Sequence, residues 1–219
     1  MQDREAKLLK AIIESHIKTA RPVGSQGLAS KDFDLSPATI RNEMAVLEDQ
    51  GLIMQPHTSA GRIPTVLGYQ YYLDNLLSIK KSSAEETAEL KQAYHQDIRN
   101  LAKLLAHKTH LACTAALGPS EYYFTGLFNL FSQVEFEDYK MVLSMSQVVD
   151  SLEKAMANIY HTVDKPKILL GRDNPFSDQC AVALMPLPDQ KLLGILGPLR
   201  MDYNRILGLL NSIENIYAK

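Results

Sequence analysis

The chain has 219 residues, 46% of them hydrophobic and 22% charged, which is enough for an ordinary hydrophobic core without metals or disulfides. Its formal net charge of −2 excludes a general electrostatic attraction to nucleic acid, so any DNA contact must depend on where the charges lie. Cys113 and Cys180 lie in apolar stretches and are expected to be buried, reduced thiols. No leader sequence and no apolar run near the ~20 residues of a membrane span is seen, so we expect a cytoplasmic protein.

Three helices are predicted at the start of the chain. Residues 3–20 form an amphipathic helix, since their apolar residues recur on one face (Leu8, Leu9, Ile12, Ile13, His16 and Ile17). Ser25 is placed to cap a short second helix over residues 26–31, and the turn at 32–35 is expected to insert Phe33 and Leu35 into a core.

The third helix has the clearest start signal in the chain. Ser36 is an N-cap residue, Pro37 occupies the first helical position, and Gly51 is suited to end the helix in a left-handed conformation. Its buried stripe is predicted to consist of Ile40, Met44 and Leu47.

Two short strands are predicted next, at 52–55 and 62–64, around a loop of small and polar residues. Pro64 is tolerated mainly at a sheet edge, so the pair should be an edge hairpin. Thr65 can cap a further helix over 66–77. Three helices followed by a hairpin is the order of a winged helix-turn-helix, whose third helix enters the major groove of DNA.

The residue types of this segment suit DNA recognition. Arginine pairs with guanine and asparagine with adenine, and small residues at the helix start permit close approach to the duplex. Loop residues of the wing suit contacts to phosphates or to the minor groove. The candidate DNA-binding residues are Ser25, Ser36, Ala38, Thr39, Arg41, Asn42, His57, Thr58, Ser59 and Arg62.

Other interpretations of these residues stay open. Arg41 and Asn42 also fit a solvated helix face, and winged helices also serve as protein-interaction modules. A DNA-binding protein should gather Lys18, Arg21, Arg41 and Arg62 on one side, around Thr39 and Asn42. His57 has no partners at metal-ligand spacing, and no catalytic or phosphate-binding motif is present, so neither a metal, nor a cofactor, nor catalysis is expected.

The second half, residues 79–219, is predicted to be a separate α+β domain after a linker at 79–82. Ser83 and Glu86 form a capping-box pattern that opens one long helix, over residues 84–115, which ends before Gly118. Strands are predicted at 122–125 and 168–170 and as a hairpin at 180–187 and 192–196, with helices at 139–160 and 202–217. The stretches 126–131 and 145–149 are interpreted as core. Arg200 is expected to pair with a carboxylate and Asp202 to cap the last helix.

Several segments together resemble the heat-inducible transcription repressor family, HrcA. They are Pro22-Val23-Gly24-Ser25, the third helix from Ser36 to Gly51, the wing from Pro56 to Tyr69, Phe128-Asn129-Leu130-Phe131, Glu135-Phe136 and the run from Gly194 to Tyr203. The resemblance covers most of the chain. It implies a dimeric repressor of chaperone genes that acts on an inverted-repeat operator, assisted by the chaperonin GroEL, and a second domain that is GAF-like.

The chain differs from the family pattern between about Leu117 and Tyr122, where the family carries several strands and an inserted domain. The resemblance therefore implies a shortened GAF-like domain, in which dimer contacts must come from other surfaces. The surfaces left are the tyrosine-rich helix over 66–77, the long helix over 84–115 and the sheet of the second half. Our first choice for part of the interface is the long helix, at Leu101 and Leu105, and the alternative is that both leucines belong to the core. A small-ligand-gated regulator is the remaining alternative, and it would show an apolar pocket with a few convergent polar groups in the second half.

Overall fold

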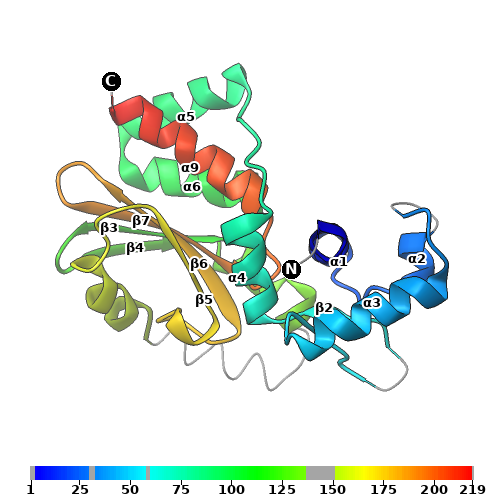
Figure 1. Cartoon of the computed structure of the whole chain (residues 1–219). Helices are drawn as coiled ribbons and strands as arrows, with labels where there is room; N and C mark the ends of the chain where they lie inside the picture. Colours follow the sequence, from blue (N-terminus) through cyan, green and yellow to red (C-terminus); the bar gives the residue numbers. More distant parts are fainter. Residues whose placement is uncertain (1–2, 30–32, 58–59, 137–150, 219) are drawn as a thin grey trace. The chain divides into compact units, whose positions relative to one another are not determined.

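The computed structural model describes residues 3–29, 33–57, 60–136 and 151–218. Its contacts divide the chain into two compact units, Met1–Ser78 and Ile79–Lys219 (Figure 1). Each unit has its own buried core, so each is described by itself.

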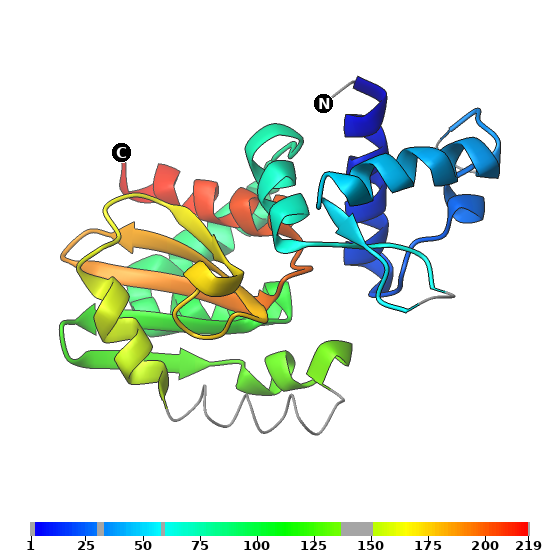
Figure 2. The ribbon, with the colours of Figure 1, turned by 60° about the horizontal axis from the view of Figure 1, so that its bottom comes forward.

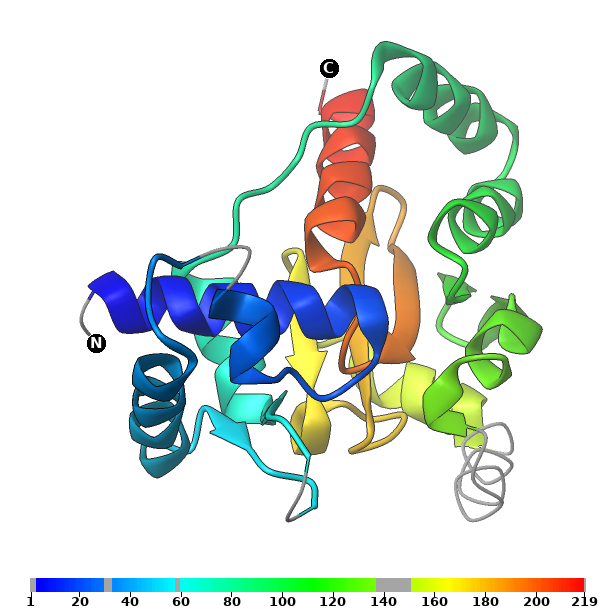
Figure 3. The same ribbon diagram turned by 90° about the vertical axis from the view of Figure 1, so that its right-hand side faces the viewer.

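The first unit consists of three helices, a two-stranded antiparallel sheet and a fourth helix. In chain order these are α1 (Asp3–Thr19), α2 (Ser25–Ala29), α3 (Pro37–Asp49), β1 (Ile53–Met54), β2 (Ile63–Pro64) and α4 (Val66–Asn75). Four apolar residues of α1, Leu8, Leu9, Ile12 and Ile13, are fully buried, and α1 packs against α3 and α4 (Figure 3). This is the α+β order that the sequence predicts for a winged helix.

The ends of α3 are formed as the sequence predicts. The Oγ of Ser36 accepts a hydrogen bond from the backbone N–H of Thr39 at 3.1 Å, and Gly51 has a φ of +71° after the last turn. Ile40, Met44 and Leu47 are buried, so the predicted stripe is confirmed.

Two expectations for the neighbouring segment are wrong. Ser25 is itself the first residue of α2 and does not stand before the helix as a cap. Phe33 and Leu35 are only partly buried, because they lie at the surface beside the start of α1 and are not enclosed by the core.

The wing is held against the rest of the unit by close backbone contacts. Val23 and Arg62 exchange two backbone hydrogen bonds, of 2.8 and 2.9 Å, beside the β1–β2 pair. A Cβ on Gly61 would lie 2.4 Å from the carbonyl oxygen of Val23, so only glycine fits at this position.

The second unit is built on a five-stranded antiparallel sheet. Its strands are β3 (Ala112–Gly118), β4 (Glu121–Thr125), β5 (Lys167–Leu170), β6 (Cys180–Leu187) and β7 (Lys191–Pro198), in the spatial order β4-β3-β7-β6-β5. The predicted strands and the hairpin are thereby confirmed, and β3 is an additional strand. The β3–β4 connection is a short turn, in which Gly118 pairs with Glu121, so no inserted domain lies there.

Helices cover both faces of this sheet, which agrees with the α+β class predicted for this half of the chain. On one face lie α5 (Ala84–Gln96), α6 (Ile98–Thr109) and α9 (Tyr203–Tyr217) (Figure 1). On the other face lie α7 (Leu127–Phe131), the 3-10 helix Val134–Phe136 and the helical residues 151–160 (Figure 2). A second 3-10 helix, Gly171–Asp173, follows β5. The predicted cap of the closing helix is confirmed, since Asp202 accepts from the N–H of Arg205 at 3.0 Å.

The single long helix predicted for residues 84–115 is wrong. Asp97 has an extended backbone (φ −170°, ψ 146°) that ends α5, and its carboxylate caps α6 by accepting from the N–H of Arg99 at 3.2 Å. Aspartate favours such caps over helix interiors because its side chain competes for backbone N–H groups. His110, with a φ of +54°, ends α6, and the chain then enters β3.

The predicted dimer contacts on that helix are also wrong. Leu101 and Leu105 are fully buried, because α6 packs against β3, β4 and β7 of its own unit. Residues 79–82 are likewise more than a linker: the N–H of Lys80 donates to Oδ1 of Asn204 at 2.5 Å, and the Ser82 hydroxyl donates to the carbonyl of Gly208 at 3.1 Å.

The remaining predictions for the second unit have mixed outcomes. Cys113 and Cys180 are buried free thiols, and burial raises the pKa of Cys180 to about 12. In the stretch 126–131, Leu130 is buried as expected, but Phe128 is 81% exposed and is not core. Residues 145–149 lie outside the described residues. Arg200 pairs with a carboxylate as predicted, that of Glu135.

Candidate nucleic-acid interface

The exposed side of α3 carries the residues that the sequence assigns to base contacts. Ala38, Arg41 and Asn42 are exposed, whereas the buried stripe of the same helix faces the core. Within the described part of the chain, the side chains of Arg41 and Asn42 have no hydrogen-bond or ion-pair partner. Both side chains therefore keep their hydrogen-bonding groups available for another molecule.

Thr39 is held differently from its neighbours. Its hydroxyl lies 2.9 Å from the Oγ of Ser36, which also caps the helix. A hydroxyl has one donor hydrogen and two lone pairs, so Ser36 retains capacity for one more bond and Thr39 for two. The two residues act first on the geometry of the helix start and can reach a phosphate or a base edge only from that fixed position.

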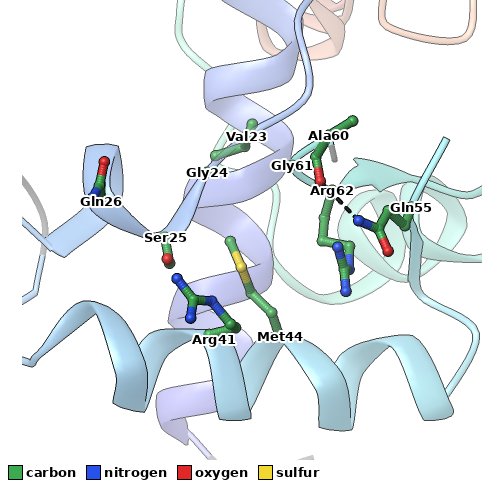
Figure 4. A pocket seen from close by; sticks show the side chains of 10 residues that line it. All are labelled: Val23, Gly24, Ser25, Gln26, Arg41, Met44, Gln55, Ala60, Gly61 and Arg62. Atoms are coloured by element: carbon green, nitrogen blue, oxygen red, sulfur yellow. Dashed lines mark hydrogen bonds between the residues drawn. The ribbon is translucent and has the colours of Figure 1, made fainter. Parts of the chain in front are cut away.

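A pocket of about 510 Å³ lies between α2, α3 and the wing (Figure 4). Ser25 enters it from α2 and Arg41 from α3, and the guanidinium of Arg41 points toward Ser25. Arg62 lines the wing side. The fold thus brings together three of the predicted site residues that lie 16 to 37 positions apart in the sequence.

Arg62 is less available than the sequence indicates. Its Nε donates to Oε2 of Glu48 at 2.9 Å, and its side chain is only 20% exposed. Glu48 is the penultimate residue of α3, so the ion pair connects the wing to the end of that helix and offsets the charge of Arg62. The expected grouping of four cations around one site is therefore only partly present: Lys18 and Arg21 are exposed but do not line the pocket.

The other predicted wing residues are placed only in part. His57 is exposed, and its carbonyl accepts from the N–H of Ala60 at 2.9 Å. Thr58 and Ser59 lie outside the described residues. Over the described ranges, no group of three His, Cys, Asp or Glu side chains is arranged to hold a metal ion, and no helix there is long and apolar enough to cross a membrane.

Sequence reasoning missed the residues that shape the pocket. Gln26 and Gln55 line it, and the Nε2 of Gln55 donates to the carbonyl of Ala60 at 3.1 Å, which holds the wing loop. Gly61 also lines the pocket, and it carries a sequence signal because it is a glycine directly before a predicted strand. The glutamines had none, because a surface glutamine is common and its partner lies in another element.

The fold and the site together define a two-unit α+β protein, in which a helical unit with a two-stranded wing precedes a unit built on a five-stranded antiparallel sheet. A family model described as "HrcA protein C terminal domain" matches residues 61–207. This match covers more than half of the 219 residues, and the chain therefore belongs to the HrcA family.

Curated relatives agree with this assignment, and one solved structure has a similar fold. A protein of Desulfitobacterium hafniense, named heat-inducible transcription repressor HrcA, is 41% identical over 74% of this chain and 49% of its own length. The protein of the same name from Acetivibrio thermocellus is 35% identical over 82% of this chain and 52% of its own length. The chain thus spans about half the length of these curated relatives. A crystal structure of a hypothetical protein covers 99% of this chain and 98% of its own with a TM-score of 0.79; at 18% identity it supports the fold alone.

Proposed function

We propose that this chain is a DNA-binding transcriptional repressor that inserts α3 into the major groove of duplex DNA. The observation that carries the proposal is the pair Arg41 and Asn42, which are exposed and unpartnered beside the capped start of the helix. In winged-helix proteins this end of the third helix faces the base edges. Arg41 is suited to guanine O6 and N7, and Asn42 to adenine N6 and N7.

The pocket and the wing support a role in contacting the DNA backbone. Ser25 and Arg62 border the pocket on either side of Arg41, and Ser36, Thr39 and Ala38 give the helix start a small, hydrogen-bonding surface. His57, Thr58 and Ser59 complete the proposed contact surface on the wing. Contacts of this kind hold the protein in register on the duplex without reading the sequence.

The names of the relatives extend the proposal to regulation. Since they are called heat-inducible transcription repressors, we infer that the chain represses heat-inducible genes. The family resemblance extends this proposal to chaperone genes, with the cytoplasm as the place of action. It acts as a homodimer on an inverted repeat, because two copies of one helix then read two equivalent half-sites. Binding, with the chaperonin GroEL as a further partner, accounts for this activity without a catalytic step, a cofactor or a metal.

The test begins by selecting bound sequences from random duplex DNA with the purified chain, followed by titration of the selected duplex. Arg41→Ala and Asn42→Ala should each weaken specific binding by about 1–3 kcal/mol and relax the preference at one base position. Arg172→Ala is the matched control, because Arg172 is exposed in the second unit and makes no recorded ion pair in the described residues. Unchanged affinity in both α3 variants would refute the major-groove assignment.

A winged helix that binds only proteins is distinguished in the same experiment. Such a module would enrich no sequence from the random pool. It would also show no salt-dependent affinity for duplex DNA, whereas neutralisation of phosphates makes binding fall steeply with salt.

A further inference from the structure

The two edges of the sheet in the second unit are not equivalent. The edge strand β5 is preceded by Lys165 and Pro166 and begins with Lys167, and charged residues and proline are the usual means by which proteins protect an edge. The other edge strand, β4, contains neither lysine nor proline, although Pro119 lies two residues before it and the strand begins with the charged Glu121. Among the described residues β4 pairs only with β3, so the backbone groups along its outer side have no strand partner.

The side chains of β4 are fixed by their own unit on both faces of the sheet. Tyr122 and Phe124 pack against the core under α7, while Glu121 pairs with Arg99 of α6 at 2.5 Å. The ring of Tyr123 lies under the ammonium of Lys103, which is 6.0 Å from its centroid. The strand is therefore a well-held edge with an aromatic sequence, which favours pairing with another strand.

We propose that β4 pairs with β4 of a second copy of this chain, in an antiparallel arrangement centred on Tyr123. This proposal rests on the dimer of the proposed function and names its interface. An antiparallel strand pair has a two-fold axis, which is the symmetry that an inverted repeat demands. The five strands of each copy then form one continuous ten-stranded sheet.

The register follows from the sequence of the strand. Centring on Tyr123 uses all five residues, Glu121–Thr125, and it places Tyr122 opposite Phe124 of the second copy, twice. Aromatic pairs directly across two strands are among the favourable cross-strand contacts. The same register places Glu121 opposite Thr125 of the second copy, so no like charges face each other.

Phe128, in the helix that directly follows β4, supplies a second observation. It follows β4 by three residues and its side chain is 81% exposed, although the neighbouring Leu127, Leu130 and Phe131 of α7 face the core. In the antiparallel pair, the residues that follow Thr125 of one copy run past Glu121 of the other. An exposed ring there adds apolar area to a strand pair that would otherwise be small for a stable interface.

Sedimentation velocity on the full chain over a micromolar concentration series tests the pairing and its register. Thr125→Glu places one carboxylate opposite Glu121 of the second copy, and by symmetry this repulsion occurs twice in the dimer. It should raise the dimer dissociation constant about tenfold. Thr125→Lys places opposite charges there and should lower it. The double variant Glu121→Gln with Thr125→Glu should restore pairing, because it removes one of the two facing carboxylates without placing a second cation beside Arg99.

Circular dichroism melting of every variant checks that each remains folded, and Phe128→Ser, at an exposed position, should weaken the dimer without changing the melting temperature. A monomeric wild type, or equal effects of Thr125→Glu and Thr125→Lys, would overturn the interface. The proposed contacts to a single operator half-site all lie in the first unit, so half-site binding tests the proposed function independently of the pairing.

Discussion

Glu86 and Arg205, 119 residues apart in the chain, form a two-pronged ion pair that joins the start of α5 to the first turn of α9. One guanidinium nitrogen of Arg205 donates to Oε2 of Glu86 at 2.8 Å and the other donates to Oε1. The same carboxylate accepts from the N–H of Ser83 at 3.2 Å and so completes the capping box of α5. A local helix-start motif is thus also a tertiary contact.

This pair predicts an acid-sensitive contribution to stability. The hydrogen bonds from Arg205 and from the Ser83 N–H outweigh burial and lower the pKa of Glu86 from 4.5 to about 2. A carboxylate with a lowered pKa stabilises the fold fully above its unfolded value, and the stabilisation is lost as the pH falls from about 4.5 through about 2. Glu86→Gln should lower the melting temperature at pH 7 by about 2–4 °C, and the difference from wild type should shrink below pH 4.5. Glu85→Gln is the control, because Glu85 is the exposed neighbour of Glu86 in the sequence. A difference that stays constant down to pH 2 would contradict the assignment.

The ion pair between Arg62 and Glu48 predicts how the wing contributes to DNA binding. Arg62→Ala should weaken binding to all duplexes to a similar degree and lower the salt slope by about one unit. Glu48→Gln should tighten binding to all duplexes, because it leaves the Arg62 charge unopposed at the surface. Titrations at several salt concentrations measure both effects, with Glu85→Gln as the control. If Glu48→Gln weakens binding instead, the ion pair serves to position the wing.

The burial of Leu105 predicts that substitutions there impair folding rather than assembly. Its side chain is fully buried where α6 packs against the sheet, so Leu105→Ala should cost about 2–5 kcal/mol and Leu105→Asp should unfold the second unit. His107→Asp, at an exposed position of the same helix, should leave the fold intact. Circular dichroism with light scattering measures both properties. A folded monomeric Leu105→Asp variant would revive an interface on α6.

Thr114 predicts a stabilising substitution. It is 2% exposed in β3, and its hydroxyl has no hydrogen-bond partner in the described structure. Valine has the same branched shape and no polar atom to bury unpaired. Thr114→Val should therefore raise the stability of the second unit by about 1 kcal/mol in denaturant titration. Ala116→Val, on the same face of the strand, is the control for added volume, and a destabilised Thr114→Val would mean that the hydroxyl is satisfied.

Local sequence signals were sufficient to predict helix ends, because a single residue type caps a helix or adopts a left-handed turn there. Ser36, Pro37 and Gly51 bound α3, Ser83 opens α5 and Asp202 opens α9, because caps and left-handed turns depend on neighbours within a few residues. Continuous apolar runs likewise predicted the β6–β7 hairpin, since a strand buried between two layers must be apolar on both faces. The same signals predicted where Arg41 and Asn42 stand on their helix, because the buried stripe leaves only the opposite side exposed.

By itself, then, the sequence determined the order of most helices and strands, the family resemblance and the exposed face of α3. All of these depend on patterns of residues close together in the chain. Tertiary structure alone decided the break at Asp97, because a helical pattern on either side conceals one residue that caps the second helix. It also decided that Arg62 faces Glu48 and that Phe128 faces solvent. A side chain's partners depend on elements brought together from distant parts of the chain, and periodicity carries no information about which elements those are.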